Sequence, residues 1–397
     1  MDTTKTASHN KKRQRKIFLV KPYFIAILLI LGTVPFGFIR DLGAMALAIQ
    51  FIICVFCISL TLSLRFSRLK LYSLLAYYLT AIISNVLIAS TPNIASPVFL
   101  QITLLGLLSA LDTAKINNYN IRIMNKVFDI YFMLYTFTSI YLLMFASVLS
   151  FNDRLKIASS STTIAILSGL TALYYFRQLI DPKQRFAFIK TTIHFLGFCT
   201  AIFVIINIQS RGAFLVTVIS CFILSYQITM SSFQSSAKII VLLGVGASVF
   251  IYFGAQFLER FELGNFDSLN QFTSDRLVTQ EYMLSQIEAF SALEMLIGKG
   301  FGATRTLVIS SGLEFPHMDP LLIMFDGGLI LLLVYNVFFY ALYKNIGKNT
   351  AIISMLYLTG LHTNLSLWPN ILALSGLFAY SMTYAGALQS RNHLSHR

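Results

Sequence analysis

Three side chains in this sequence are suited to act on a phosphorylated substrate. Arg211 and Arg276 carry guanidinium groups, which stay charged and present a planar fork to phosphate oxygens. His317 has the side-chain type that suits proton transfer near neutral pH. Two further cations, Lys299 and Arg305, lie between Arg276 and His317. Together these groups could hold a diphosphate and remove a proton from a hydroxyl.

Each of these residues also has an ordinary explanation. Arg211 lies at the end of an apolar run, where a basic side chain can reach toward the membrane surface as an anchor. Arg276 would lie in the first turn of a helix, where the helix dipole disfavours a cation, and this hints at another purpose. Pro316 and Pro320 fix the backbone around His317, which suits a positioned base but also an ordinary loop.

The elements that must position these groups are membrane-spanning helices. The chain has 397 residues, of which 56% are hydrophobic and 12% are charged. Soluble domains carry about 25% charged residues. The apolar residues come in runs close to 20 residues long, the length that crosses the hydrocarbon core of a bilayer. The composition therefore excludes an ordinary soluble protein, a disordered chain and a disulfide scaffold, and it predicts an all-α polytopic membrane protein.

Twelve spans are predicted, with one long loop near the C-terminal third. The predicted spans are 20–39, 42–63, 71–90, 97–112, 127–149, 158–176, 190–209, 212–230, 238–257, 319–343, 349–366 and 370–389. They divide the chain into a basic tail (1–19), nine spans (20–257), a loop (258–318), three spans (319–389) and a C-terminal tail (390–397).

The basic residues predict the orientation of these spans. With both termini in the cytoplasm, 22 of the 30 Lys and Arg residues fall in cytoplasmic segments, as the positive-inside rule requires. The net charge of +14 is then an orientation signal, and it does not argue for nucleic acid as a partner. The loop 258–318 falls on the outer face and holds half of the 16 acidic residues.

The middle of this loop is predicted to be one amphipathic helix. Five apolar residues recur at spacings of four, three, three and four, which is typical of one helix face: Met283, Ile287, Phe290, Leu293 and Ile297. The segment Gly298-Lys299-Gly300-Phe301-Gly302 is predicted to end this helix in a flexible turn.

The order of four motifs resembles the O-antigen polymerase and O-antigen ligase family of bacterial envelopes. The motifs are Ser210-Arg211-Gly212-Ala213 at the outer start of a span, Arg276 opening the loop helix, Gly298–Gly302 after it, and His317 with Asp319 followed by an apolar run through Asp326-Gly327-Gly328. The motifs cover about residues 205–340. The layout of twelve spans with one large periplasmic loop, similar to that of GT-C glycosyltransferases, extends the resemblance to the whole chain.

The resemblance implies a metal-independent, inverting membrane glycosyltransferase with no cofactor. Its donor would be a glycan on undecaprenyl diphosphate at the periplasmic face of the inner membrane, and a chain-length regulator protein would be a further partner. Arg211 and Arg276 would clamp the donor diphosphate, and His317 would accept the proton of the acceptor hydroxyl. Lys299 and Arg305 would be second phosphate contacts, and Asp319 would orient His317 or bind sugar. His362 is the rival candidate for the base.

Three functions stay open at this point. The residue after His317 is Met318, where the ligase pattern usually has Asn, Ser or Gln, and this favours the polymerase over the ligase. A lipid-linked oligosaccharide flippase or transporter is the alternative of another class. Transport predicts ionisable residues inside the spans. In this sequence the ionisable residues avoid the span centres, with Asp129 and Asp326 near span ends.

Overall fold

The computed structural model describes part of the chain, and the fold is taken from that part. The described residues are 72, 77, 79, 83, 97–110, 118–145, 150–151, 154–155, 161–180, 188–208, 210–229, 276–313, 318–346, 350–362, 372, 375–376 and 378–379. The predicted spans 20–39, 42–63 and 238–257 lie outside these residues, and 71–90 and 370–389 are represented only at single positions.

The described chain is helical apart from one short strand pair. The helices are α4 (Pro97–Ala110), α5 (Asn118–Phe145), α6 (Ser161–Ile180), α7 (Phe188–Asn207), α8 (Arg211–Thr229), α11 (Arg276–Glu288), α12 (Ala292–Ile297), α13 (Ala303–Ser311), α14 (Asp319–Ile346) and α15 (Thr350–His362). The strands β1 (Ser150–Phe151) and β2 (Arg154–Leu155) pair antiparallel between α5 and α6.

Three of the described helices are long and apolar enough to cross a membrane. The apolar stretches are Phe188–Asn207 in α7, Arg211–Ile228 in α8 and Asp319–Lys344 in α14. They coincide with the predicted spans 190–209, 212–230 and 319–343. The prediction of a helical membrane protein is confirmed to this extent, and the number of twelve spans stays a prediction.

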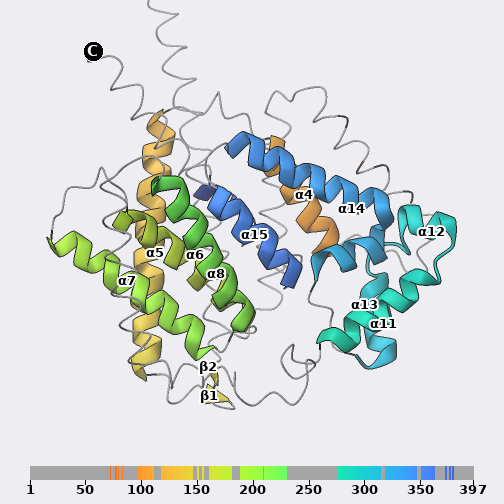
Figure 1. Cartoon of the computed structure of the whole chain (residues 1–397), viewed down its shortest axis with the longest axis horizontal. Helices are drawn as coiled ribbons and strands as arrows, with labels where there is room; N and C mark the ends of the chain where they lie inside the picture. The colour runs from red at the N-terminus through yellow and green to blue at the C-terminus, as the bar shows by residue number, and fades with distance from the viewer. Residues whose placement is uncertain are drawn as a thin grey trace, which may run out of the picture.

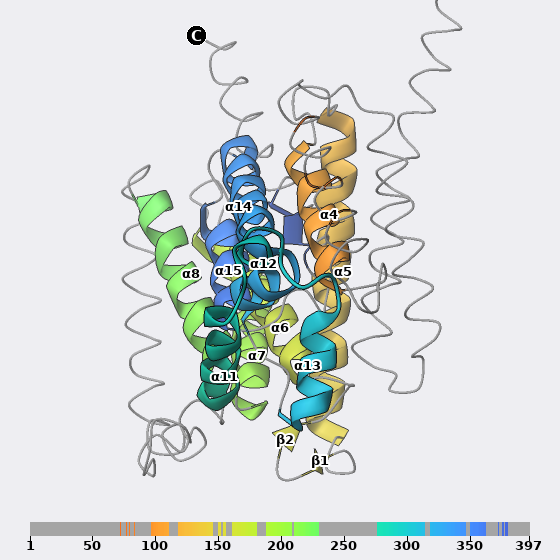
Figure 2. The same ribbon diagram turned by 90° about the vertical axis from the view of Figure 1, so that its right-hand side faces the viewer.

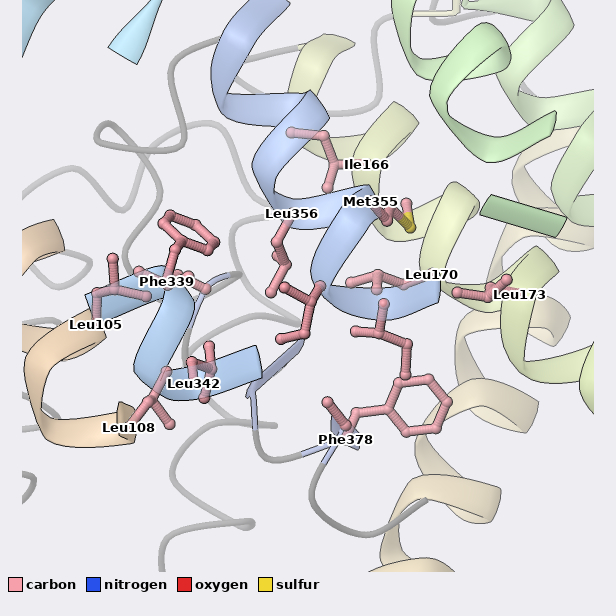
Figure 3. Close-up of a cluster of buried hydrophobic side chains, with 14 of the residues drawn as sticks. Leu105, Leu108, Ile166, Leu170, Leu173, Phe339, Leu342, Met355, Leu356 and Phe378 are labelled. Atoms are coloured by element: carbon pink, nitrogen blue, oxygen red, sulfur yellow. The ribbon is translucent and has the colours of Figure 1, made fainter. Parts of the chain in front are cut away.

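The core lies between α4, α6, α14 and α15. Figure 3 shows its aliphatic side chains interdigitating, among them Leu105 of α4, Leu170 of α6 and Leu342 of α14. Aromatic rings extend the core toward α5, where the ring of Phe132 stacks on the ring of Tyr174 with centroids 4.6 Å apart. Since α14 contacts both α4 and α15, it is the central helix of this core.

The loop helices lie on one side of the bundle (Figure 1). Helix α5 runs from top to bottom in both views, and β1, β2, α11 and α13 lie toward the lower end (Figures 1 and 2). Helix α12 lies higher, beside the broken part of α14. Helices α11, α12 and α13 all contact α14, so the loop helices pack on α14.

The prediction of a single amphipathic loop helix is wrong. The segment forms two helices, because Ser291 caps a new helix at α12: its hydroxyl accepts from the Glu294 N–H, and the Glu294 carboxylate accepts from the Ser291 N–H. Met283 and Ile287 are buried as predicted, whereas Leu293 is 56% exposed because the interruption changes the phase of the helix.

Candidate functional site

The site region is built around a break in α14. Gly328 has φ 68° and ψ −170°, a conformation outside the helical region, and it divides α14 into a short first part and a longer second part. Carbonyls at a helix end lack intrahelical donors. Two carbonyls before this break accept from the glycine loop instead: Lys299 N–H donates to Phe325 O and Gly300 N–H donates to Asp326 O, both at 2.9 Å.

The side chain of Asp326 joins the same two segments. Its Oδ2 accepts from Gly302 N–H at 3.0 Å, and its Oδ1 accepts from Thr304 N–H at 2.9 Å and from Thr304 Oγ1 at 2.7 Å. These donors belong to the first turn of α13, where a helix favours an anion. Gly302 has no side chain to cap this helix, and the fully buried Asp326 caps it from α14.

Two glycines allow the backbones to meet. A side chain at Gly298 would collide with the backbone of Asp326 and Gly327, and one at Gly328 would collide with the backbone of Leu296 and Ile297. We call this contact, formed by Gly298–Thr304 and Phe325–Gly328, the loop–kink junction. Phe301 of the loop is also buried in the main core. The predicted flexible turn is therefore a fixed element, held by backbone hydrogen bonds and by the buried Phe301.

Lys299 already has partners on the protein. Its Nζ lies 3.9 Å from Glu294 Oε1, 5.0 Å from the centroid of the Phe290 ring and 6.0 Å from that of Phe325. The hydrogen bonds from Ser291 lower the pKa of Glu294 below its ordinary value, and the charge of Lys299 lowers it further. Lys299 thus stays partly exposed beside the junction with its charge balanced.

Asp319 opens α14 and is fully buried. Its Oδ2 accepts from Gln101 Nε2 of α4 at 2.7 Å. The same oxygen and the hydroxyl of Tyr335 lie close to Gly360 of α15, where an added side chain would meet both. Asp319 therefore fixes the start of α14 against α4 and α15.

The structure describes some of the other predicted site residues with their side chains, some only as helix positions, and one not at all. Arg211 is the first residue of α8 and is half-buried, and Arg305 is exposed on α13. Arg276 is the first residue of α11, as predicted, and His362 is the last of α15, which ends before the predicted end of that span at 366. Neither side chain is among those described. His317 lies outside the described residues, two positions before the buried Asp319.

The junction brings two of the four sequence motifs together, Gly298–Gly302 and Asp326-Gly327-Gly328. Helix α8 packs mainly on α6 and α15, whereas the loop helices pack on α14. The packing of the described helices therefore does not by itself join Arg211 to the loop.

Sequence reasoning missed two residues that matter for this geometry. Gln101 is a polar residue inside an otherwise apolar helix, and this could have marked it as a partner for a buried charge. Thr304 gave no comparable signal, because its role depends on Asp326, 22 positions away.

Within the described residues, no three His, Cys, Asp or Glu side chains come together in a way that could hold a metal ion. No protein-family model and no curated protein matches the chain.

Proposed function

We propose that this protein is an O-antigen polymerase of the bacterial inner membrane. It would join repeat units carried on undecaprenyl diphosphate into a long polysaccharide at the periplasmic face, with both termini in the cytoplasm. A chain-length regulator would be its protein partner.

The observation that carries the proposal is the loop–kink junction. The resemblance rests on four motifs in a fixed order, and the junction joins the third to the fourth by hydrogen bonds to Phe325 O, Asp326 O and the Asp326 carboxylate. In the sequence, His317 lies between the two segments that these hydrogen bonds join, two positions before Asp319, the first residue of α14.

The cations of the proposed site have different roles. Arg211 and Arg276 would hold the donor diphosphate and stabilise the charge that develops on it as the glycosidic bond breaks. Arg305 is exposed on α13, so it is a better candidate than Lys299 for a second phosphate contact. Lys299 would have to leave Glu294 to bind phosphate, so we assign it mainly to the junction.

The proposed reaction is a single inverting displacement. The oxygen of the acceptor hydroxyl attacks the anomeric carbon of the donor, and the bond from that carbon to the diphosphate oxygen breaks. The electron pair leaves with undecaprenyl diphosphate, and His317 accepts the hydroxyl proton. Asp319 is buried against Gln101, so we assign it to positioning the backbone beside His317 and not to binding sugar.

The test is the glycan attached to lipid A-core in the producing strain after single substitutions. Arg211→Ala, Arg276→Ala and His317→Ala should each leave the core with at most one repeat unit, while Arg211→Lys should retain part of the polymer. Lys344→Ala is the matched control, because Lys344 is an exposed cation at the far end of α14. It should give normal chain lengths.

Other outcomes point to other functions. A core without any repeat unit, with long chains left on the carrier lipid, would identify a ligase. Repeat units that accumulate on the cytoplasmic face would identify a flippase. Normal long glycan in all three alanine variants would contradict the assignment of the site.

A further inference from the structure

The second part of α14 has one exposed apolar face. Leu329, Leu333, Val337 and Tyr340 recur at helical spacing and are all exposed. The opposite face is buried in the core through residues such as Leu331 and Phe338. The helix is also long and apolar enough to span a membrane, and on this ground we assign the exposed stripe to lipid.

Helix α12 continues this apolar face, although it belongs to the segment predicted to lie outside the membrane. Leu293 is 56% exposed and Leu296 is 48% exposed, and their spacing of three puts them on one side of the helix. The other side, with Met295 and Ile297, is turned toward the protein. The backbone of Leu296 touches Gly328, the residue before the α14 stripe begins.

Helices α11 and α12 occupy different levels along α5. In both views the upright helix α5 extends well above and well below α12, whereas α11 lies near the lower end of the bundle (Figures 1 and 2).

The charge on α12 is paired with the cation of the glycine loop that follows it. Glu294 and Lys299 are paired, and the Lys299 ammonium lies over the rings of Phe290 and Phe325. Ionisable groups at membrane depth are costly unless they pair with one another. The backbone groups after α12 are also satisfied, because Lys299 N–H and Gly300 N–H donate to α14, as non-helical backbone at that depth requires.

We propose that α12 and the glycine loop after it form a re-entrant segment, and that the edge with Leu293 and Leu296 contacts the acyl chains of bilayer phospholipids. The membrane boundary of this protein then runs through the segment between α11 and α12. The inference concerns lipid contact alone and does not depend on the proposed enzymatic activity.

The experiment measures the depth of single labels in the reconstituted full-length protein. The four native cysteines are replaced by alanine, and a single cysteine is introduced by Leu293→Cys, Leu296→Cys, Leu333→Cys or Leu284→Cys for attachment of an environment-sensitive fluorophore. Leu333 reports the lipid-facing stripe. Leu284 is the matched control, because it is also a leucine, is 50% exposed and belongs to α11, the helix that lies toward the lower end of the bundle.

Labels at positions 293 and 296 should behave like the label at 333. Quenching by acyl-chain spin-labelled phosphatidylcholine should be several-fold stronger than at 284, and quenching by aqueous iodide should be correspondingly weaker. Iodide quenching at 293 and 296 equal to that at 284 would overturn the proposal. Protection from both quenchers would also overturn it, because the edge would then be covered by protein.

A second measurement uses the unmodified protein. Vesicles that contain phosphatidylcholine with a diazirine in the acyl chain are illuminated, and the attachment sites are mapped by mass spectrometry. Adducts are expected within 292–297 as well as within 329–340. Adducts in the α14 stripe without any in 292–297 would contradict the lipid contact.

Discussion

The main core and the loop–kink junction are both buried, but they are held together by different groups. In the core, side chains from α4, α6, α14 and α15 interdigitate, and each can move slightly when a neighbour changes. In the junction, backbone meets backbone at Gly298 and Gly328, and a buried carboxylate satisfies the first turn of α13. The junction should therefore tolerate far less change than the core, and the following substitutions test this.

The largest effect is expected for Gly328→Ala. This φ and ψ combination is essentially confined to glycine and costs other residues about 1–3 kcal/mol, before the collision with Leu296 and Ile297 is added. We expect little monodisperse protein on gel filtration in detergent. Gly312→Ala is the control, since Gly312 has φ 67° but nothing within 4 Å of an added side chain. It should cost only about 1 kcal/mol, and equal losses in both variants would contradict the interlocked backbone.

Asp326→Ala should have the next largest effect. It leaves the donors of Gly302 and Thr304 without an acceptor, and each buried unpaired donor costs roughly 1–3 kcal/mol. Thr304→Val removes the hydroxyl bond and keeps both backbone bonds, so it should lower stability by about 1 kcal/mol. The thermal unfolding midpoints in detergent should therefore fall in that order. A Thr304→Val loss as large as that of Asp326→Ala would show that the carboxylate does not cap α13.

Phe132→Leu tests the core. Phe132 is fully buried and stacks on Tyr174, and an aromatic pair contributes about 0.5–1.5 kcal/mol beyond simple burial. Leucine retains most of the apolar contact, so we expect a loss near this value and well-folded protein by gel filtration. Failure to fold would mean that the core tolerates substitution as poorly as the junction does.

The smallest effect concerns the capping box of α12. Ser291→Ala should lower stability by about 1 kcal/mol near neutral pH. The backbone N–H of Ser291 and, to a smaller extent, its hydroxyl lower the pKa of Glu294 below its ordinary value of 4.5, so the folded state favours the ionised carboxylate. Ser291→Ala removes only the part that comes from the hydroxyl. That stabilisation is complete above pH 4.5 and is lost as the pH falls through the lowered pKa.

The difference in unfolding midpoint between wild type and Ser291→Ala should therefore shrink under acidic conditions. Ser285→Ala is the control, since Ser285 donates only to the Tyr282 carbonyl, and its effect should not change with pH. A Ser291→Ala effect that is constant across this range would contradict the role of Glu294.

Much of the fold follows from local sequence, and the junction does not. The starts of α4, α8, α11 and α14 fall at or within one residue of their predicted positions, because Pro97, Arg211 and Asp319 interrupt apolar runs and N-cap types precede Arg276. The break at Gly328 lies inside an apolar run of span length and therefore gave no periodic signal. It is maintained by contacts with Leu296, Ile297 and the glycine loop, which lie far from Gly328 in the sequence and which no local pattern records.

The division of the loop helix could have been predicted. Ser291 and Glu294 have the spacing of a capping box, which marks a helix start. The spacing of the apolar residues fits one uninterrupted helix equally well, and the prediction of a single helix followed that spacing. Of the candidate site, the order of the motifs was readable from sequence, while the burial of Asp319 against Gln101 depends on packing between helices.

We propose that this membrane protein polymerises glycan at its outer face. The most direct measurement is the length distribution of the glycan on lipid A-core in a deletion strain, with and without the wild-type gene on a plasmid. If the protein is a polymerase, the deletion strain should carry cores with at most one repeat unit, and complementation should restore a full ladder. A full ladder in the deletion strain would contradict it.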